Sequence, residues 1–375
     1  MRVRTLTVGI APDEIFKKGT IERISNLLHE NKERIEEDDI EVQTIRISTD
    51  LWSDPSVSPE DVMEKVTLLE SSARLHRIDL ISIGPARNEE QIGMVPRIIE
   101  GSSITCSSSL VATREDGVLH GNVLASAKAV KDISRIAKDG SKNFMFASIA
   151  CCPPDTPFFP ASYHSEGTPS MTIGLENGDL VWRASERASG LREAGKMLTH
   201  IYQEEIDRLL ELVGDDPAFK GIDLSLAPGL GPEESIGNAV EKMTGSPFGS
   251  MGTLSACSEL TRSVRNLNAP SCGYSGLMLP VLEDVGLGCG ADNRSYTVQG
   301  LLLYSSVCGT GLDAVPLPGS SMTSDLASTI LDMASLSSKW NKPLSARLMP
   351  IPDKDAGEMT DLNSPYLKDC SILEL

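Results

Sequence analysis

The sequence predicts a single-domain α/β protein with a largely parallel sheet, and two observations carry that prediction. Apolar, β-rich runs alternate with amphipathic helical patterns along the whole chain, as they do where strands are joined by crossover helices. The 375 residues contain no repeat, low-complexity tract or convincing linker. We therefore expect a single α/β domain over residues 1–375, with a C-terminal tail from about residue 351. The alternation alone fits either a barrel or a doubly wound sheet.

Strands are expected where short runs are apolar and rich in β-branched residues. These runs are 3–10, 41–48, 78–83, 104–106, 143–150, 170–174, 221–227, 298–307, 312–317 and 346–350.

Helices are expected where apolar residues recur at helical spacing, as they do between residues 15 and 28. Ser58 can cap a helix that begins at Pro59, and Asp61 adds a negative charge near its N-terminus, where the helix dipole favours it. The Gly/Cys-rich segment 286–293 is expected to be a loop. The expected helices are 13–30, 59–75, 90–100, 122–138, 187–212, 233–243, 253–267 and 322–340.

Composition and charge narrow the classes of partner. The chain has 34 Lys and Arg against 53 Asp and Glu, a formal net charge of −19. Nucleic-acid binding needs clustered basic residues, so we expect no nucleic-acid partner. No apolar run approaches the roughly 20 residues of a membrane span, and the N-terminus does not fit a signal peptide. We therefore expect a soluble, cytoplasmic protein without a membrane partner. Self-association is compatible with its size, although no interface can be read from the sequence.

The eight cysteines and five histidines match no recognised metal or disulfide pattern. There is no CxxC and no HExxH, which argues against a zinc ribbon, a dithiol centre and a zincin. The glycine-rich pieces 229–231 and 286–290 fit neither a dinucleotide fingerprint nor a P-loop, and there is no GxSxG elbow. We expect no nucleotide cofactor, while a divalent metal held by acidic residues stays open.

One candidate site lies at the end of the run 298–307. In parallel α/β folds, functional groups collect at the carboxyl ends of strands. Cys308 stands there, directly before Gly309, and is a candidate nucleophile or proton donor; the alternative is a small buried core residue. Asp313 lies in the next apolar run, where an unpaired charge would be costly, and is a candidate acid or base.

Other thiols also follow expected strands. Cys106 and Ser107 end the run 104–106, while Cys151 and Cys152 end the run 143–150, before a proline-rich loop. They are candidates to line a substrate cavity, although free cysteines are commonly buried for packing. The remaining cysteines are expected to be structural: Cys257, Cys272, Cys289 and Cys370.

The segment after the proline-rich loop adds Tyr163 and His164. His164 is a candidate general base or proton donor, and a hydrogen-bonded loop histidine is the alternative. Tyr163 is a candidate substrate contact.

Acidic residues follow or interrupt two further apolar runs. Glu283 and Asp284 come directly after the run 274–282, which begins with the candidate substrate contacts Tyr274 and Ser275. The two acids could bind a metal, hold a substrate amine or transfer protons, with Glu283 the stronger candidate; an ordinary helix start or surface turn is the alternative.

Asp223 stands within the run 221–227, two residues before Ser225. An unpaired charge inside an apolar strand is costly, so Asp223 faces either a polar site or solvent. Both residues are candidate substrate contacts.

Several motifs together resemble the family catalogued as domain of unknown function 711. They are Cys106-Ser107-Ser108, PFFPASYH (157–164), GIDLSLAP (221–228), YSGLMLPVLED (274–284) and CGTGLDAVPLPG (308–319). The likeness covers about residues 75 to 350, with the motifs in the family's order. Ser320-Ser321-Met322 departs from it, because many relatives have an acid and a small hydroxyl residue there.

The resemblance implies a fold similar to the barrel of pyruvate formate-lyase and ribonucleotide reductase. That barrel has ten strands in two antiparallel five-stranded halves, with a cysteine-bearing loop inside. Radical chemistry is not implied, because residues 335–375 lack the Arg-Val-x-Gly-aromatic signature of glycyl radical enzymes. The family supplies no catalytic role to carry over.

We expect an enzyme that acts on a small polar metabolite in a barrel cavity, as a lyase, isomerase or hydrolase. In this hypothesis Cys308 is the nucleophile or proton donor, and Asp313, His164 and Glu283 transfer protons or position the substrate. One alternative is an enzyme with a divalent metal on Glu283, Asp313, Asp223 or His164. The other is a non-catalytic metabolite sensor or partner-binding protein.

Overall fold

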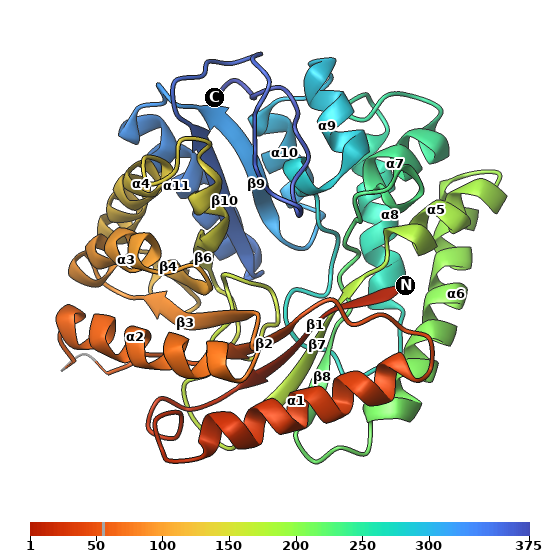
Figure 1. The fold of residues 1–375 in the computed structure, drawn as a ribbon. Helices are drawn as coiled ribbons and strands as arrows, with labels where there is room; N and C mark the ends of the chain where they lie inside the picture. The colour runs from red at the N-terminus through yellow and green to blue at the C-terminus, as the bar shows by residue number, and fades with distance from the viewer. Residues whose placement is uncertain (55–56) are drawn as a thin grey trace.

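The computed structural model of the chain describes residues 1–54 and 57–375, which form a ten-stranded sheet with helices around it (Figure 1). The strands are β1 (Arg2–Gly9), β2 (Ile45–Ser48), β3 (Leu80–Ala86), β4 (Thr105–Thr113), β5 (Gly117–Val118), β6 (Phe146–Ala150), β7 (Ser170–Glu176), β8 (Phe219–Asp223), β9 (Gly311–Pro318) and β10 (Leu344–Ile351). Their order is β8-β7-β1-β2-β3-β4-β6-β10-β9, and β5 lies off this path, paired to β4.

The sheet consists of two groups of parallel strands that run in opposite directions. In the first group, β1, β2, β3, β4 and β6 are parallel neighbours. In the second group, β7 is parallel to β8 and β9 is parallel to β10. The groups meet antiparallel at β1/β7 and at β6/β10. The carboxyl ends of the two groups therefore lie at opposite edges of the sheet.

The segment 271–280 contacts both ends of this path of strands. Ser271 bridges Ile222 of β8, Leu277 bridges Leu226, and Pro280 bridges Asp313 of β9, all in parallel orientation. A segment between β8 and β9 in the sequence thus also lies between them in space.

Helices pack against the sheet because each buries an apolar stripe. On α4, for example, Val123, Ala127 and Val130 are buried in the main hydrophobic core, and each such side chain stabilises the fold by roughly 1–3 kcal/mol. The helices are α1 (Thr20–Glu36), α2 (Pro59–Leu75), α3 (Glu89–Gly101), α4 (His120–Ser134), α5 (Gly178–Arg187), α6 (Leu191–Val213), α7 (Ile236–Thr244), α8 (Thr253–Arg265), α9 (Val285–Asp292), α10 (Val298–Ser305) and α11 (Thr323–Trp340). None of the helices in the described residues is long and apolar enough to cross a membrane.

Two sequence predictions of element type are wrong. The expected strand 298–307 is helix α10, which Thr297 caps by accepting from the Gly300 N–H at 3.1 Å. Length and apolarity did not distinguish a buried strand from a short helix there. The expected loop 286–293 is helix α9, and its glycines have a packing reason: a Cβ on Gly286 would lie 2.5 Å from the Asn238 backbone nitrogen of α7.

Other predictions differ mainly at boundaries. The expected cap of α2 is present, with Ser58 accepting from the Asp61 N–H at 3.1 Å. The helix expected over 13–30 is α1, which begins later and ends later. The helix expected over 187–212 is α6, which begins at Leu191, and the preceding helix α5 was not expected.

The loop 151–169 lies against the face of the sheet that the helices leave free. Phe146 and Ala150 of β6 belong to the main core beside the helices. Side chains alternate across a strand, and Ala147 and Ile149 accordingly point to the other face. There they pack in a second cluster with loop residues and a residue of 271–280: Cys152, Phe158, Ala161 and Tyr274.

The C-terminal tail, residues 352–375, returns to the sheet. Leu373 donates its N–H to the Pro316 carbonyl of β9 at 3.1 Å, and Lys368 donates to the Leu282 carbonyl at 2.7 Å. The tail thereby covers the region around β9 and the short 3-10 turn Val281–Glu283.

Candidate functional site

Seven charged residues form one continuous path of ion pairs, here called the charged network, and Glu41 branches from it at Arg2, 3.8 Å away. It runs from Glu234 through Arg2, Glu176, Arg4, Glu283 and Arg347 to Asp313. Acidic and basic members alternate along this path, so every charge has a neighbour of opposite sign. The network begins at half-buried residues and ends among fully buried ones.

The inner end of the network contains two carboxylates bridged by one guanidinium. Arg347 Nη2 lies 2.6 Å from Glu283 Oε1 and 2.7 Å from Asp313 Oδ1, and Arg347 Nε donates to the same Asp313 oxygen at 2.7 Å. The side chains of Arg347 and Asp313 are 3% and 1% exposed. These three residues are called the Glu283–Arg347–Asp313 group below.

Different strands bring this group together. Arg347 comes from β10 and Asp313 from β9, while Glu283 ends the 3-10 turn after the segment 271–280. The guanidinium carbon of Arg347 lies 4.2 Å from the centre of the Phe144 ring and 5.3 Å from that of Phe158, a residue of the loop 151–169. The aromatic rings hold the guanidinium in a dry position.

Burial changes the pKa of the Asp313 carboxyl. Burial raises the pKa of Asp313, the Arg347 guanidinium opposes this change, and the negative charge of Glu283 adds to it. The pKa of Arg347 is raised although burial opposes it, because Asp313 and Glu283 favour its charged form. Asp313 is therefore more disposed to hold a proton than a solvent-exposed aspartate is.

Arg4 connects the buried group to the outer part of the network. Its Nη1 lies 2.8 Å from Glu283 Oε2 and its Nη2 lies 3.1 Å from Glu176 Oε2, at the last residue of β7. The Arg4 side chain is 26% exposed. Solvent therefore reaches the network on the Arg4 side.

Arg46 of β2 lies beside the network without joining it. Its Nε donates to the Thr44 hydroxyl at 2.9 Å, and that hydroxyl donates to the Arg4 carbonyl at 2.7 Å. The Arg46 guanidinium carbon lies 5.0 Å from the centre of the Phe159 ring in the loop 151–169. Burial lowers the pKa of Arg46 to about 10, so the side chain stays protonated at neutral pH.

The predicted thiols are dispersed. Cys106 is buried with its sulfur 3.8 Å from Met145 Sδ, and burial raises its pKa to about 12. Ser107 next to it bonds the Gly84 carbonyl at 3.0 Å and accepts from the Trp52 indole, on the other face of β4. Neither residue makes a hydrogen bond to the Glu283–Arg347–Asp313 group in the part of the chain described.

The thiols at the base of the loop 151–169 are also buried. Cys152 Sγ lies 3.0 Å from the Tyr274 hydroxyl, and burial raises the pKa of this thiol to about 12. Cys151 has a φ of 53°, a left-handed conformation that is rare for non-glycine residues. Cys308 is fully buried in the main core beside the helices, and no hydrogen bond joins it to Asp313 among the described residues.

His164 lies at the opposite edge of the sheet. Its Nδ1 is 2.6 Å from Asp155 Oδ1, which also accepts from the Ser170 hydroxyl at 2.7 Å. Lys220 Nζ is 3.6 Å from the other Asp155 oxygen. Although burial opposes it, the hydrogen bonds from His164 and Ser170 lower the pKa of Asp155. The His164 side chain is 6% exposed, and its Nε2 is buried without a partner among the described residues.

Strand β1 places this histidine far from the charged network. The His164 ring rests on Gly9, where a Cβ would lie 2.8 Å from it, while Arg4 belongs to the network. Five residues of extended strand separate Gly9 from Arg4, about 17 Å at ~3.3 Å per residue. The expectation that His164 shares one site with Glu283 and Asp313 therefore lacks support from the geometry.

An ion pair that sequence analysis missed lies near His164. Arg87 pairs with both oxygens of Asp50, at 2.8 and 2.5 Å, and Ser165 donates to Asp50 at 2.7 Å. Asp50 is fully buried. The neighbouring Tyr163 donates its hydroxyl to the Cys152 carbonyl at 2.9 Å, and burial raises its pKa.

Asp223 and the residues predicted beside it hold the chain in place. Asp223 accepts from the backbone of Tyr274 and Ser275 at 3.0 and 2.9 Å, and from the hydroxyl of Ser225 at 2.6 Å. These bonds tie the segment 271–280 to β8, and burial raises the Asp223 pKa. Asp284 has a similar role, since it accepts from the first N–H groups of α7 and α9.

The residues that complete the network were not predicted. Arg347 stands inside the run 346–350, and Arg2 and Arg4 alternate in the first strand. The argument that singled out Asp223, a charge within an apolar strand, applies equally to Arg347 and could have found it.

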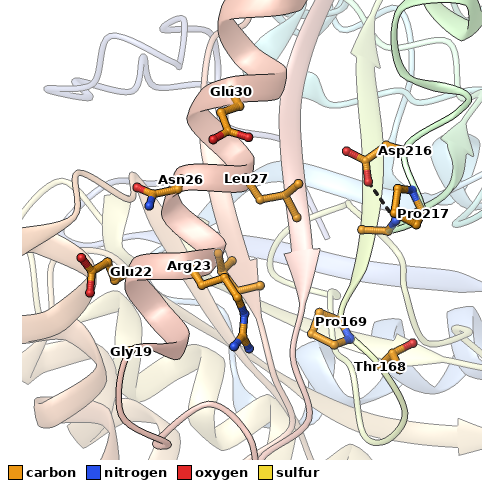
Figure 2. A pocket seen from close by; sticks show the side chains of 12 residues that line it. Gly19, Glu22, Arg23, Asn26, Leu27, Glu30, Thr168, Pro169, Asp216 and Pro217 are labelled. Atoms are coloured by element: carbon orange, nitrogen blue, oxygen red, sulfur yellow. Dashed lines mark hydrogen bonds between the residues drawn. The ribbon is translucent and has the colours of Figure 1, made fainter.

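A surface groove of about 810 Å³ lies away from all the predicted site residues (Figure 2). It lies between helix α1 and the segments 168–169 and 216–218, and its rim carries Glu22, Arg23, Glu30 and Asp216. Its polar side chains are spread along an open surface and do not converge on one point. The buried network, and not this groove, brings reactive groups together.

Sequence comparisons place the chain in a family. A family model described as "Uncharacterised ACR (DUF711)" matches residues 1–363. The chain belongs to this family. Among its relatives is a UPF0210 protein of Methanococcus aeolicus, 28% identical over 72% of the chain and 62% of the relative. A UPF0210 protein of Bifidobacterium adolescentis is 28% identical over 81% of the chain and 72% of the relative. One of Carboxydothermus hydrogenoformans is 28% identical over 72% of the chain and 63% of the relative. The matched region covers 62% to 72% of the length of these three relatives.

Proposed function

We propose that this DUF711 protein is an enzyme that transfers protons on a small polar metabolite at the Glu283–Arg347–Asp313 group. The observation that carries the proposal is a pair of buried carboxyls bridged by one buried arginine, with solvent access through Arg4. Two carboxyls in unequal environments are a common basis for acid and base roles. A lyase or isomerase that removes a proton next to a carbonyl fits this set best, and a hydrolase is the third class.

The two carboxyls take different roles in this proposal. Asp313 is the proton donor, because burial raises its pKa. Glu283 is the proton acceptor, with Arg4 and Arg347 fixing its two oxygens in place. Arg347 stabilises negative charge that develops on the substrate.

Thiol chemistry has less support than the sequence suggested. With pKa values raised to about 12, Cys106 and Cys152 are protonated at neutral pH and are weak nucleophiles. Cys308 lies in the main core. Cys106 keeps a role as a lining residue, since the charges of Arg46 and Arg347 act on it.

We also propose that the sheet closes into the ten-stranded barrel that the family resemblance implies. The isolated bridges of 271–280 to both β8 and β9 support closure, since they add a parallel strand between the two ends of the sheet. With β5 left aside, because it lies off the path, and the segment 271–280 added, the resulting halves would have five strands each, with the loop 151–169 inside. Unlike a cysteine-bearing loop tip, this loop presents Phe158 and Phe159 to Arg347 and Arg46.

The setting of the enzyme is part of the proposal. All eight cysteines are free, which suits a reducing compartment such as the cytoplasm. A net charge of −19 disfavours nucleic acid as a partner. Self-association stays a prediction.

The test is turnover of a metabolite mixture, followed by mass spectrometry. Wild-type protein should convert at least one small polar metabolite, while Asp313→Asn and Glu283→Gln should convert it at least ~100-fold more slowly, the usual contribution of a positioned acid or base. Glu70→Gln, which alters a carboxylate of α2 outside the network, is the matched control and should keep the wild-type rate. Equal rates in all four proteins would contradict the proposal.

Two alternatives make different predictions. A metal enzyme needs converging ligands, and the described residues contain no group of three or more His, Cys, Asp and Glu that could hold an ion. A metabolite sensor would bind a ligand and return it unchanged, so the same mixture would show retention on the protein without conversion.

A further inference from the structure

Arg46 differs from the arginines of the charged network in having no acidic partner. Arg2, Arg4 and Arg347 each contact at least two carboxylates within 4 Å. In the described part of the chain, Arg46 bonds only the Thr44 hydroxyl, through Nε, and contacts the Phe159 ring. Its two Nη groups, which form the fork that binds oxyanions, are therefore without a protein acceptor.

The free Nη groups are not fully sealed from solvent. Arg46 is half-buried, and its Nη atoms are absent from the set of fully buried polar atoms that lack partners. The Nε bond to Thr44 and the Phe159 ring fix the guanidinium in one orientation. A fixed cation with a free, solvent-accessible fork is a preorganised anion site.

The position of Arg46 connects it with the proposed reaction. Thr44 links its Nε to the backbone of Arg4, and the charges of Arg4 and Glu283 both act on its guanidinium.

We propose that the substrate carries an oxyanion, a carboxylate or a phosphate, which the two Nη groups of Arg46 bind in a fork. The inference rests on the proposed function, because it places the reacting end of the same substrate toward Glu283 and Asp313. Phe159 covers one face of the guanidinium and leaves the edge for the anion. A net charge of −19 repels anions at long range, so specific binding requires such a local cation.

The experiment measures the binding of acetate and of inorganic phosphate by ligand-detected NMR, with neutral acetamide as the matched probe. Wild-type protein should bind one of the anions in a saturable manner and ignore acetamide. Arg46→Gln should weaken binding about tenfold or more, the usual value of a charge-assisted hydrogen bond. Arg46→Lys, which keeps the charge but loses the fork, should weaken it less. Arg135→Gln, an exposed arginine of the C-terminal end of α4, should bind as the wild type does.

The outcomes separate this inference from the proposed function. Stronger binding of acetate would identify the oxyanion of the substrate as a carboxylate, and stronger binding of phosphate would identify it as a phosphate. Asp313→Asn should still bind the anion while losing turnover; retained turnover in that variant would sink the proposed function and leave the anion site standing. No saturable anion binding by the wild type, or equal binding by a folded Arg46→Gln or Arg46→Lys variant, would overturn the inference.

Discussion

The two edges of the sheet carry polar sites of different construction. At the Arg4 edge, long charged side chains pair in sequence, and each carboxylate meets at least one arginine. At the Gly9 edge, His164 pairs with Asp155 through Nδ1 and leaves its Nε2 without a partner among the described residues. Among the described residues, the charged side chains of the first edge are paired apart from Arg46, while the second edge holds a buried ring nitrogen without a partner.

The difference follows from the direction of the strands. Asp50 and Arg87 follow the carboxyl ends of β2 and β3 in the first group. Glu176 ends β7 in the second group, which runs the opposite way. Polar residues at the carboxyl ends of the strands therefore lie at two opposite edges of this sheet and do not form one site.

The largest expected effect comes from breaking the charged network at its centre. Arg347→Met should lower the free energy of unfolding by about 3–5 kcal/mol, because it leaves Glu283 and Asp313 buried without a counter-charge. Urea unfolding measures this loss. Arg135→Met, an exposed arginine, should change it by less than about 0.5 kcal/mol. A loss below about 1 kcal/mol for Arg347→Met would show that the buried pairing matters little.

A smaller effect is expected at the other edge. His164→Leu should lower the free energy of unfolding by about 1–2 kcal/mol, because Asp155 loses one hydrogen bond but keeps Ser170 and Lys220. His200→Leu, at an exposed position of α6, is the control. In a variant that combines His164→Leu with Arg347→Met, the two losses of unfolding free energy should add within about 0.5 kcal/mol, since the sites are far apart. A larger departure from additivity in this double-mutant cycle would mean that the two edges act as one site.

The smallest effect is a difference in the pH dependence of stability. The pKa of Asp155 is lowered, so its contribution is present above its unfolded value of ~3.9 and is lost as pH falls through the folded pKa. The pKa of Asp313 is raised, so its cost appears as pH rises from ~3.9 toward the folded pKa. Relative to the wild type, Asp155→Asn should lose less stability on acidification, and Asp313→Asn should lose less as pH rises.

Urea unfolding between pH 3 and 7 measures this difference. Each group can change the slope by at most about 1.4 kcal/mol per pH unit. Curves for the two variants that shift in the same direction would contradict the assigned environments of the two carboxyls.

The alternation of strands and helices was predictable from sequence, and so were two members of the charged network, but the grouping of the candidate residues was not. Asp313 and Glu283 were predicted and do meet, because a carboxylate within or after an apolar run must find a partner. Their link, Arg347, was missed inside an expected strand. His164 was predicted but belongs to the other edge, since a sequence does not reveal that two groups of strands run in opposite directions. The glycines of α9 led to the prediction of a loop, because the sequence does not show that this helix packs closely against α7.

The central claim is that the Glu283–Arg347–Asp313 group transfers protons on a small metabolite. Conversion of a metabolite mixture by the wild type and by Asp313→Asn, compared by mass spectrometry at equal protein concentration, tests it most directly. The wild type should consume one compound, and Asp313→Asn, folded to the same extent, should consume it at least ~100-fold more slowly. Equal consumption by both proteins, or a compound that the wild type binds and returns unchanged, would contradict it.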